Sequence, residues 1–246
     1  MTWLDITVKK WIDIWEYIQE NDIKTLISYL YDIDFDDLDD MPYDEVIAME
    51  NSILFLANMP PKINKDKLTI KDYEFHLIDF NKMEFGSFID MEYYLTKDES
   101  WIVNMPNILQ ILFRQVIQEE TELHGKILEP YYNFNNKRTL LFNDILLVDI
   151  WGSINRYLEF REKIFNSYEG MFNEKEKMDE VDTTRMTAEE RKELEKEKRI
   201  SKWGYELLLM KLANNDPLKI REAMEMPLTT SFNLLAMLYE LKIGES

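Results

Sequence analysis

The sequence contains no cysteine and has few glycines, prolines and histidines. Among its 246 residues there are six glycines, seven prolines and two histidines. The absence of cysteine excludes disulfide frameworks, thiolate metal sites and catalysis by a cysteine nucleophile. The scarcity of glycine and proline disfavours an all-β fold, which needs many tight turns. The glycine-rich fingerprints of Rossmann and P-loop proteins do not occur, so these nucleotide-binding classes are disfavoured as well.

Residues suited to catalysis or metal binding are also scarce. His76 and His124 are not arranged in a metal-ligand spacing, so we expect neither a metal nor a cofactor. His76 falls in a strand-like run and is expected to be a half-buried packing residue. Asp90, within the apolar stretch FIDMEYY, is the best single candidate for a catalytic carboxylate, although a solvent-side or N–H-bonded role is the simpler interpretation. We predict a non-enzymatic protein, with an enzyme that has a cryptic carboxylate site as an alternative.

Basic residues are outnumbered by acidic ones, 29 to 48, and the net charge is −19. The segment Glu174–Lys202 is almost neutral, with ten acidic and nine basic residues, so the acidity is concentrated elsewhere. A strongly negative field repels phosphate backbones, and we expect no direct contact with nucleic acid. The acidity fits a basic protein partner, or it only keeps the copies of the protein apart.

No long hydrophobic run is present. Met1–Ile18 has acidic residues scattered through it and does not resemble a signal peptide. No run approaches the roughly 18 consecutive apolar residues of a membrane span. We therefore expect no membrane partner, and a place of action in the cytosol or in a particle assembled there.

What the sequence does contain is a large apolar fraction, 46%, arranged mostly at helical spacing. We predict a mainly α fold with over half of its residues in helices: a multi-helix bundle with one small β-hairpin and a protruding charged helix or arm. The alternating run Lys67–Phe80 predicts the hairpin. A hairpin is barely stable alone and should lie on helices or on a neighbouring subunit.

The stretch Phe85–Phe113 is the most apolar long segment, and it predicts two central helices. Asn81 is a possible cap for the first, and Lys97–Ser100 is the polar break before the second. Elsewhere Thr7 and Asp22 are expected to cap helices. Three helices are expected to begin at Met-Pro pairs, because proline suits the first helical turn. The pairs are Met41-Pro42, Met105-Pro106 and Met226-Pro227.

Two further stretches have less regular patterns. Asp32–Glu45 holds eight acidic residues and starts like a calcium loop, but it lacks the required glycine and final glutamate, so it predicts a solvated loop. His124–Thr139 is expected to be a loop, and a long helix is expected from Asn143 or Asp144 to about Phe172. The segments predicted from these patterns are 1–62 (N-terminal helical unit), 63–172 (hairpin and helical core), 173–202 (charged arm or linker) and 203–246 (C-terminal helical unit).

The layout is similar to a family of assembly proteins of tailed bacteriophages. The matching parts are MPYDE (Met41–Glu45), FGSFIDMEYYL (Phe85–Leu95), MPNILQILF (Met105–Phe113) and the C-terminal stretch WGYELLLMKLANNDPLKIREAMEMPLTTSFNLLAMLYELK (Trp203–Lys242). Together they cover about half of the chain, and none contains a catalytic motif. Glu174–Lys202 has no counterpart in the pattern.

The resemblance implies a structural role in the virion or in the host cytoplasm during assembly. The first expectation is a subunit of a head–tail connector, a ring-like homo-oligomer that also contacts other virion proteins. The alternative is a tail assembly chaperone that binds a tape-measure-like protein. Large apolar residues, methionine and six tryptophans favour interfaces of this kind. The residues predicted to make contacts are Phe85, Phe88, Ile89, Tyr93, Trp101, Trp203 and Tyr205.

Overall fold

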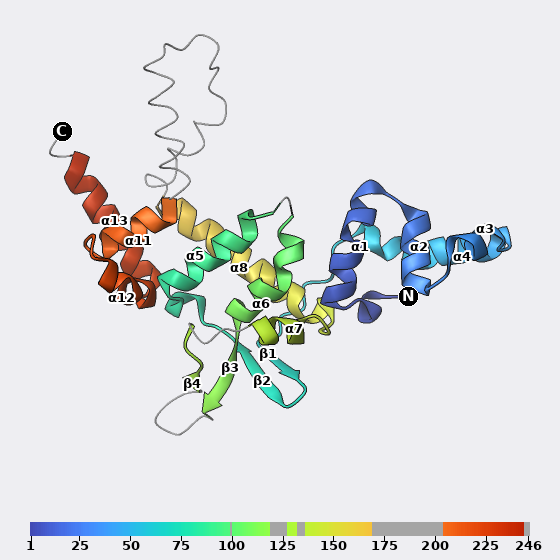
Figure 1. Cartoon of the computed structure of the whole chain (residues 1–246), viewed down its shortest axis with the longest axis horizontal. Coiled ribbons are helices and arrows are strands. Elements are labelled where there is room, and N and C mark those ends of the chain that lie inside the picture. The colour runs from blue at the N-terminus through green and yellow to red at the C-terminus, as the bar shows by residue number, and fades with distance from the viewer. Residues whose placement is uncertain (99, 119–126, 132–135, 169–203, 244–246) are drawn as a thin grey trace, which may run out of the picture. The chain divides into compact units, whose positions relative to one another are not determined.

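The computed structural model describes residues 1–98, 100–118, 127–131, 136–168 and 204–243 (Figure 1). Helices make up 69% of the structure, which confirms the predicted mainly α class. The chain divides into two compact units, the first formed by Met1–Ile78 and Met91–Arg156 and the second by Asp79–Asp90 and Tyr157–Ser246. The four segments expected from composition stay a prediction, and the charged arm at 173–202 lies outside the described residues.

The first unit begins with short helices that follow local sequence signals. The elements are η1 (Trp3–Asp5), α1 (Val8–Glu20), α2 (Ile23–Tyr31), α3 (Phe35–Asp39), α4 (Tyr43–Ile53) and η2 (Leu54–Ala57). The Thr7 hydroxyl accepts a hydrogen bond from the Lys10 N–H at 3.2 Å, and the Asp22 carboxylate accepts one from the Thr25 N–H at 3.0 Å. Both predicted caps are therefore confirmed. Between α1 and α2 the chain turns at Asn21, whose φ is 57°.

The acidic stretch Asp32–Glu45 is not the continuous loop that we expected. It contains α3 and the start of α4, with Pro42 directly before the first residue of α4. The apolar side chain of Leu38 is buried and anchors α3, and Asp36 and Asp37 occupy its first turn, where negative charge is favourable. A helix at this place also excludes the calcium-loop geometry.

The chain leaves η2 and runs along the first turns of α8 (Leu147–Ser167). The Ser153 hydroxyl donates to the Lys65 carbonyl at 2.9 Å, and Arg156 pairs with Asp66 at 2.5 Å. At Gly152 the approach is so close that a Cβ would lie 2.2 Å from the Ile63 carbonyl oxygen. We call residues 60–66 the strap, because these contacts fix them to α8.

The strap leads into a four-stranded antiparallel sheet with the order β1-β2-β3-β4 (Figure 1). The strands are β1 (Lys67–Ile70), β2 (Tyr73–Leu77), β3 (Phe113–Gln118) and β4 (Ile127–Leu128). The predicted hairpin is β1–β2, with Leu68 opposite Phe75. Two strands were not anticipated. These are β3 and β4. Strand β3 begins directly after the second central helix and pairs with β2, with Arg114 opposite His76.

The core of the first unit is built around η4 (Trp101–Asn104) and α6 (Met105–Leu112), together with α7 (Asn136–Phe142). In α6, all residues except Asn107 are buried. The proline fits the first helical turn, and the apolar run after it is covered by neighbouring elements. The other central helix, α5 (Phe85–Thr96), begins later than predicted. Asn81 does not cap it, because that residue lies in η3 (Phe80–Lys82).

The long helix α8 also begins later than predicted. Residues 143–147 instead form backbone hydrogen bonds with residues 6–9. Val8 N–H donates to the Ile145 carbonyl at 2.8 Å, and Leu147 N–H donates to the Ile6 carbonyl at 2.9 Å. These bonds between distant segments hold Asn143 and Asp144 outside the helix. The expected loop His124–Thr139 is also partly wrong, because its described residues include β4 and the start of α7.

The second unit is helical in the residues that the structure describes. Besides η3, the start of α5 and the end of α8, it contains α11 (Gly204–Leu212), η7 (Pro217–Lys219), α12 (Ile220–Glu225) and α13 (Leu228–Ile243). Phe232 packs edge-on against Phe85 and Phe88, with ring centroids 5.5 and 5.4 Å away. The chain turns at Asn214 and Asn215, and both residues have positive φ.

Candidate binding groove

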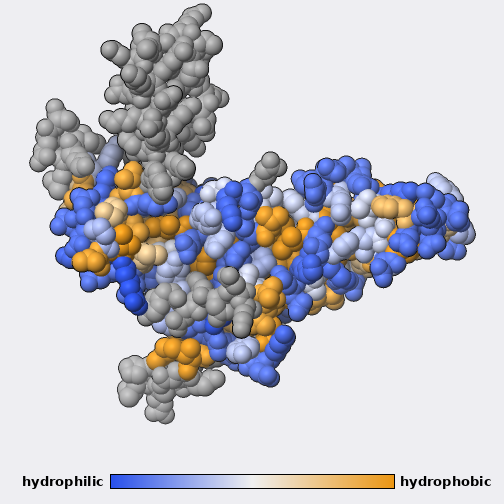
Figure 2. Space-filling model, in the orientation of Figure 1, coloured by the Kyte–Doolittle hydropathy of each residue, from blue (hydrophilic) through white to orange (hydrophobic). Residues whose placement is uncertain are grey.

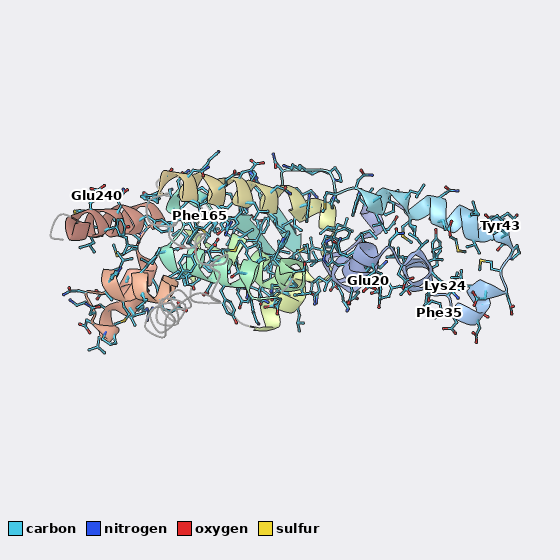
Figure 3. All side chains as sticks on the ribbon, turned by 90° about the horizontal axis from the view of Figure 1, so that it is seen from above. Glu20, Lys24, Phe35, Tyr43, Phe165 and Glu240 are labelled. Carbon is cyan, nitrogen blue, oxygen red and sulfur yellow. The ribbon has the colours of Figure 1, made fainter. Side chains whose placement is uncertain are left out.

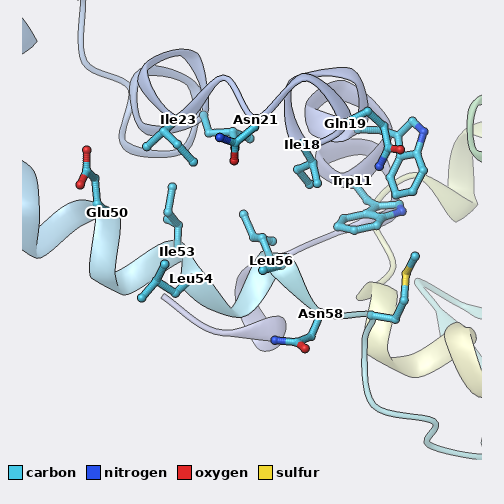
Figure 4. A pocket seen from close by; sticks show the side chains of 14 residues that line it. Trp11, Ile18, Gln19, Asn21, Ile23, Glu50, Ile53, Leu54, Leu56 and Asn58 are labelled. Carbon is cyan, nitrogen blue, oxygen red and sulfur yellow. The ribbon is translucent and has the colours of Figure 1, made fainter.

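The N-terminal helices enclose a groove of about 490 Å³ (Figure 4). One wall comes from α1 and α2, and the other comes from the end of α4 and η2. Most lining side chains are apolar. They include Trp11, Trp15, Ile18, Ile23, Ile53 and Leu54. The volume lies within the range of about 300–1,000 Å³ that is usual for ligand sites.

Tryptophan rings form one end of the groove. Trp11 lies 5.6 Å from Trp3 and 5.3 Å from Trp15, measured between ring centroids, and Trp3 contacts Phe55 at 5.0 Å. The Trp11 indole N–H is buried, and no acceptor for it is found in the described part of the chain. Trp11 is 1% exposed, so it is part of the packed base of the groove.

Several apolar side chains at the groove lack cover. Leu54 is 62% exposed and Met59 is 58% exposed, although both line the groove. Figure 2 shows apolar side chains interrupting the hydrophilic surface of these helices. Single exposed apolar residues are normal on protein surfaces, but a set of them around one hollow marks an interaction site.

The surroundings of the groove are strongly acidic. Residues 1–62 contain fourteen acidic and four basic side chains, a net charge of −10. Two of the basic side chains are already paired, Lys9 with Asp13 at 3.0 Å and Lys24 with Asp39 at 2.6 Å. Lys24 also lies 5.2 Å from the centre of the Phe35 ring (Figure 3). A ligand with basic residues would therefore be attracted here.

Hydrogen bonds between helices hold the groove open. The Tyr29 hydroxyl of α2 donates to the Asp13 carboxylate of α1 at 2.5 Å, and Tyr31 of α2 bonds to Ser52 of α4. Burial, followed by the bond to Asp13, raises the pKa of Tyr29 to about 12, so this donor keeps its proton at neutral pH. Walls fixed in this way reduce the ordering cost of binding.

The contact residues predicted from the sequence do not line this groove. Phe85 and Phe88 are fully buried, so their assignment as contact residues is corrected: they belong to the core of the second unit. Trp101 is partly buried and stacks on Trp151 at 6.0 Å, and Tyr205 is partly buried 6.0 Å from Phe88.

One predicted contact residue, Tyr93, is more exposed than the others. Tyr93 is 51% exposed, with the Lys97 ammonium 5.5 Å from its ring centre, and Ile89 is partly buried. Trp203 lies outside the described residues. The prediction followed apolar stripes, and such stripes are buried by the chain itself before any partner is needed.

The groove left a weak signal in the sequence. Ile53–Leu56 is a run of four large apolar residues at the end of a helix, and residues in such a run point in all directions. Only part of it can face the core. Ile53 and Leu56 are buried, whereas Leu54 is exposed.

One buried carboxylate elsewhere in the described residues has structural partners. Glu129 is 3% exposed, but it pairs with Arg138 and accepts the Gln115 N–H at 2.9 Å, so its role is structural. Asp90 is only partly buried. His76 is half-buried as predicted, with Nε2 2.8 Å from a Glu74 oxygen, and His124 lies outside the described residues. Within the described ranges, no three His, Asp or Glu side chains are grouped to hold a metal.

Comparisons with family models, with curated proteins and with solved structures found no match. Among the residues that the structure places, each helix is too short or too polar to cross a bilayer.

Proposed function

We propose that this chain is a non-enzymatic assembly protein whose N-terminal groove binds an amphipathic helix of a partner protein. The observation that carries the proposal is the preformed apolar groove between α1–α2 and α4–η2. Helices of partner proteins commonly bind in this way, with apolar anchors at every third and fourth position.

The negative charge around the groove indicates which residues the partner helix should have beside its apolar anchors. A net charge of −10 in residues 1–62 favours lysine or arginine beside the apolar anchors. Charge complementarity mainly raises the association rate, and the buried apolar anchors supply most of the affinity. The partner is therefore a basic amphipathic helix.

The resemblance to bacteriophage assembly proteins gives this activity a setting. A tail assembly chaperone must bind apolar helices of a tape-measure-like protein, and the groove favours that role. A connector ring subunit is the second candidate. It is favoured by the open sheet edge described below, which can bind an extended segment of another virion protein. Both roles act through protein contacts in a virion or during its assembly.

A binding titration tests the proposal. The probe is a labelled peptide of about 18 residues, long enough to form a helix on binding, with leucine at helical spacing and lysine on the other face. We expect binding to the full chain with a change in tryptophan fluorescence, because Trp11 and Trp15 line the groove. Leu54→Asp should weaken binding by about tenfold, because it puts a charge among apolar anchors.

The matched control is Leu218→Asp. Leu218 is 90% exposed and belongs to the second unit, so this change adds the same charge away from the groove. Binding should be unaffected. Equal affinity of Leu54→Asp and the unchanged protein would overturn the proposal. A mass measurement of the protein alone, with a connector protein and with a tape-measure protein then separates a ring from a transient complex.

A further inference from the structure

The outer edge of the sheet carries backbone groups that are open for pairing. Leu77 N–H donates to the Asp66 carbonyl at 2.8 Å, and in an antiparallel pair the residues alternate between facing the partner strand and facing away. With the observed register, Leu68 and Ile70 face β2, and Lys67 and Thr69 turn their N–H and C=O groups to the open edge. In the described part of the chain, no strand pairs with this edge.

This edge forms one wall of a second groove, of about 670 Å³. The opposite wall is the turn Asp144–Leu146, which is held in place by the hydrogen bond from Val8 N–H to the Ile145 carbonyl. Leu68, Ile70 and Ile145 are buried and line the groove with apolar surface. An extended segment in this groove would therefore meet a free strand edge and an apolar floor together.

The charge of the edge is unusual for a protein of net charge −19. Lys65, Lys67 and Lys71 line the groove together with Asp144 and Asp149, so the lining has a net charge of +1, with the lysines on the side of the sheet edge. Lys65 pairs with Asp149 at 2.6 Å across it, Lys67 pairs with Glu74 at 2.5 Å, and Lys71 is exposed at the hairpin turn. Lysines on an edge strand disfavour pairing with the same edge of a second copy, because like charges would lie opposite each other. In a strand that pairs with this edge, acidic side chains are favoured opposite the lysines.

We propose that an extended segment of a partner protein binds here as a fifth strand beside β1. Side chains alternate between the two faces of a strand. The segment should therefore alternate apolar residues, which contact the floor near Ile145, with acidic residues, which lie beside Lys67 and Lys71. This surface is separate from the N-terminal groove, and either one can exist without the other.

The experiment uses the full chain and peptides of about seven residues that alternate valine and glutamate, a usual strand length. The unmodified peptide should bind and should slow hydrogen exchange of the Lys67 and Thr69 amides. Two further peptides carry N-methyl groups on either alternate set of residues. One set of amides faces β1, so one methylated peptide should bind at least about tenfold more weakly, because two or more hydrogen bonds are lost. The other should bind as before.

Charge is tested separately. Lys71→Glu should weaken binding by about threefold, as expected for one exposed charge pair. The matched control Lys219→Glu adds the same charge on an exposed residue of the second unit and should change nothing. Equal binding of both methylated peptides, equal binding of a valine–lysine peptide, or dimerisation of the protein through this edge would each overturn the proposal.

Discussion

The N-terminal helices and α6 have similar apolar residues, but they bury them differently. All residues of α6 except Asn107 are buried, and its neighbours cover it on every side. In α1, which is longer, only Val8, Trp11 and Ile14 are buried. The remaining apolar residues of α1 lie at the groove or at the surface.

The difference shows that apolar content alone does not locate an interface. Trp11 and Trp151 are buried at 1% and 6% exposure, whereas Trp3 and Trp15 are only partly buried. An apolar side chain that is covered within the chain stabilises the fold. One that lies at an uncovered hollow is available to a partner. We expect substitutions in the two regions to separate these effects.

The largest effect is expected for the buried ion pair of the central region. Arg138→Met leaves the Glu129 carboxylate buried without its counter-charge, and such a loss costs about 3–5 kcal/mol of unfolding free energy. Urea unfolding of the purified protein measures it. The second variant, Arg138→Met with Glu129→Gln, removes the charge and keeps an acceptor for the Gln115 N–H. It should recover about 2 kcal/mol or more, and no recovery would show that the ion pair is not the cause.

The next prediction compares the same substitution in both regions. Leu109 of α6 is fully buried, and Leu109→Ala should cost about 2–5 kcal/mol through lost burial and a cavity. Leu54 at the groove is 62% exposed, and Leu54→Ala should change stability by less than about 0.5 kcal/mol. Urea unfolding midpoints decide the matter. Similar losses for both variants would mean that the groove is part of the stabilising core.

Local signals in the sequence predicted much of the fold. Caps at Thr7 and Asp22, the Met-Pro start of α6 and the β1–β2 hairpin depend on neighbouring residues, and the structure has them. The other two Met-Pro pairs directly precede α4 and α13. The late start of α8 could not be predicted in this way. It depends on bonds from Ile6 and Val8, which are far away in the sequence.

The site was harder to predict than the fold for the same reason. A helical stripe shows which face of a helix is apolar, but it does not show whether another segment covers that face. Phe88 and Leu54 both belong to apolar runs, yet Phe88 is fully buried and Leu54 is exposed. Only the packing of distant segments decides between them.

The third prediction concerns the strap between the two regions. At a solvent-exposed position inside a helix, Gly→Ala stabilises the folded state by about 1 kcal/mol. At Gly152 the added Cβ would meet the Ile63 carbonyl, so Gly152→Ala should instead cost about 1–3 kcal/mol and release the strap from α8. Hydrogen exchange of residues 62–66 and urea unfolding measure both effects. Ser153→Ala is the control. It removes the hydrogen bonds of the Ser153 hydroxyl with Lys65 and Arg156 without adding bulk, and it should cost about 1–2 kcal/mol. A stabilising Gly152→Ala would contradict the close approach.

The smallest effect is expected at the Asp22 cap of α2, beside the groove. The Thr25 hydroxyl and backbone N–H hold the pKa of Asp22 below its ordinary value. Its carboxylate therefore stabilises the fold above the unfolded-state pKa, and this contribution is lost as the pH falls through the folded-state pKa. Asn caps helices as well as Asp but does not titrate, so the stability of the unchanged protein relative to Asp22→Asn should decrease as the pH is lowered.

The control is Asp34→Asn, because Asp34 precedes α3 without a side-chain cap bond. Urea midpoints for the three proteins, followed from neutral pH into the acid range, measure the difference. If Asp22→Asn and the unchanged protein differ by a constant amount at every pH, the stability that the cap contributes does not depend on the charge of Asp22.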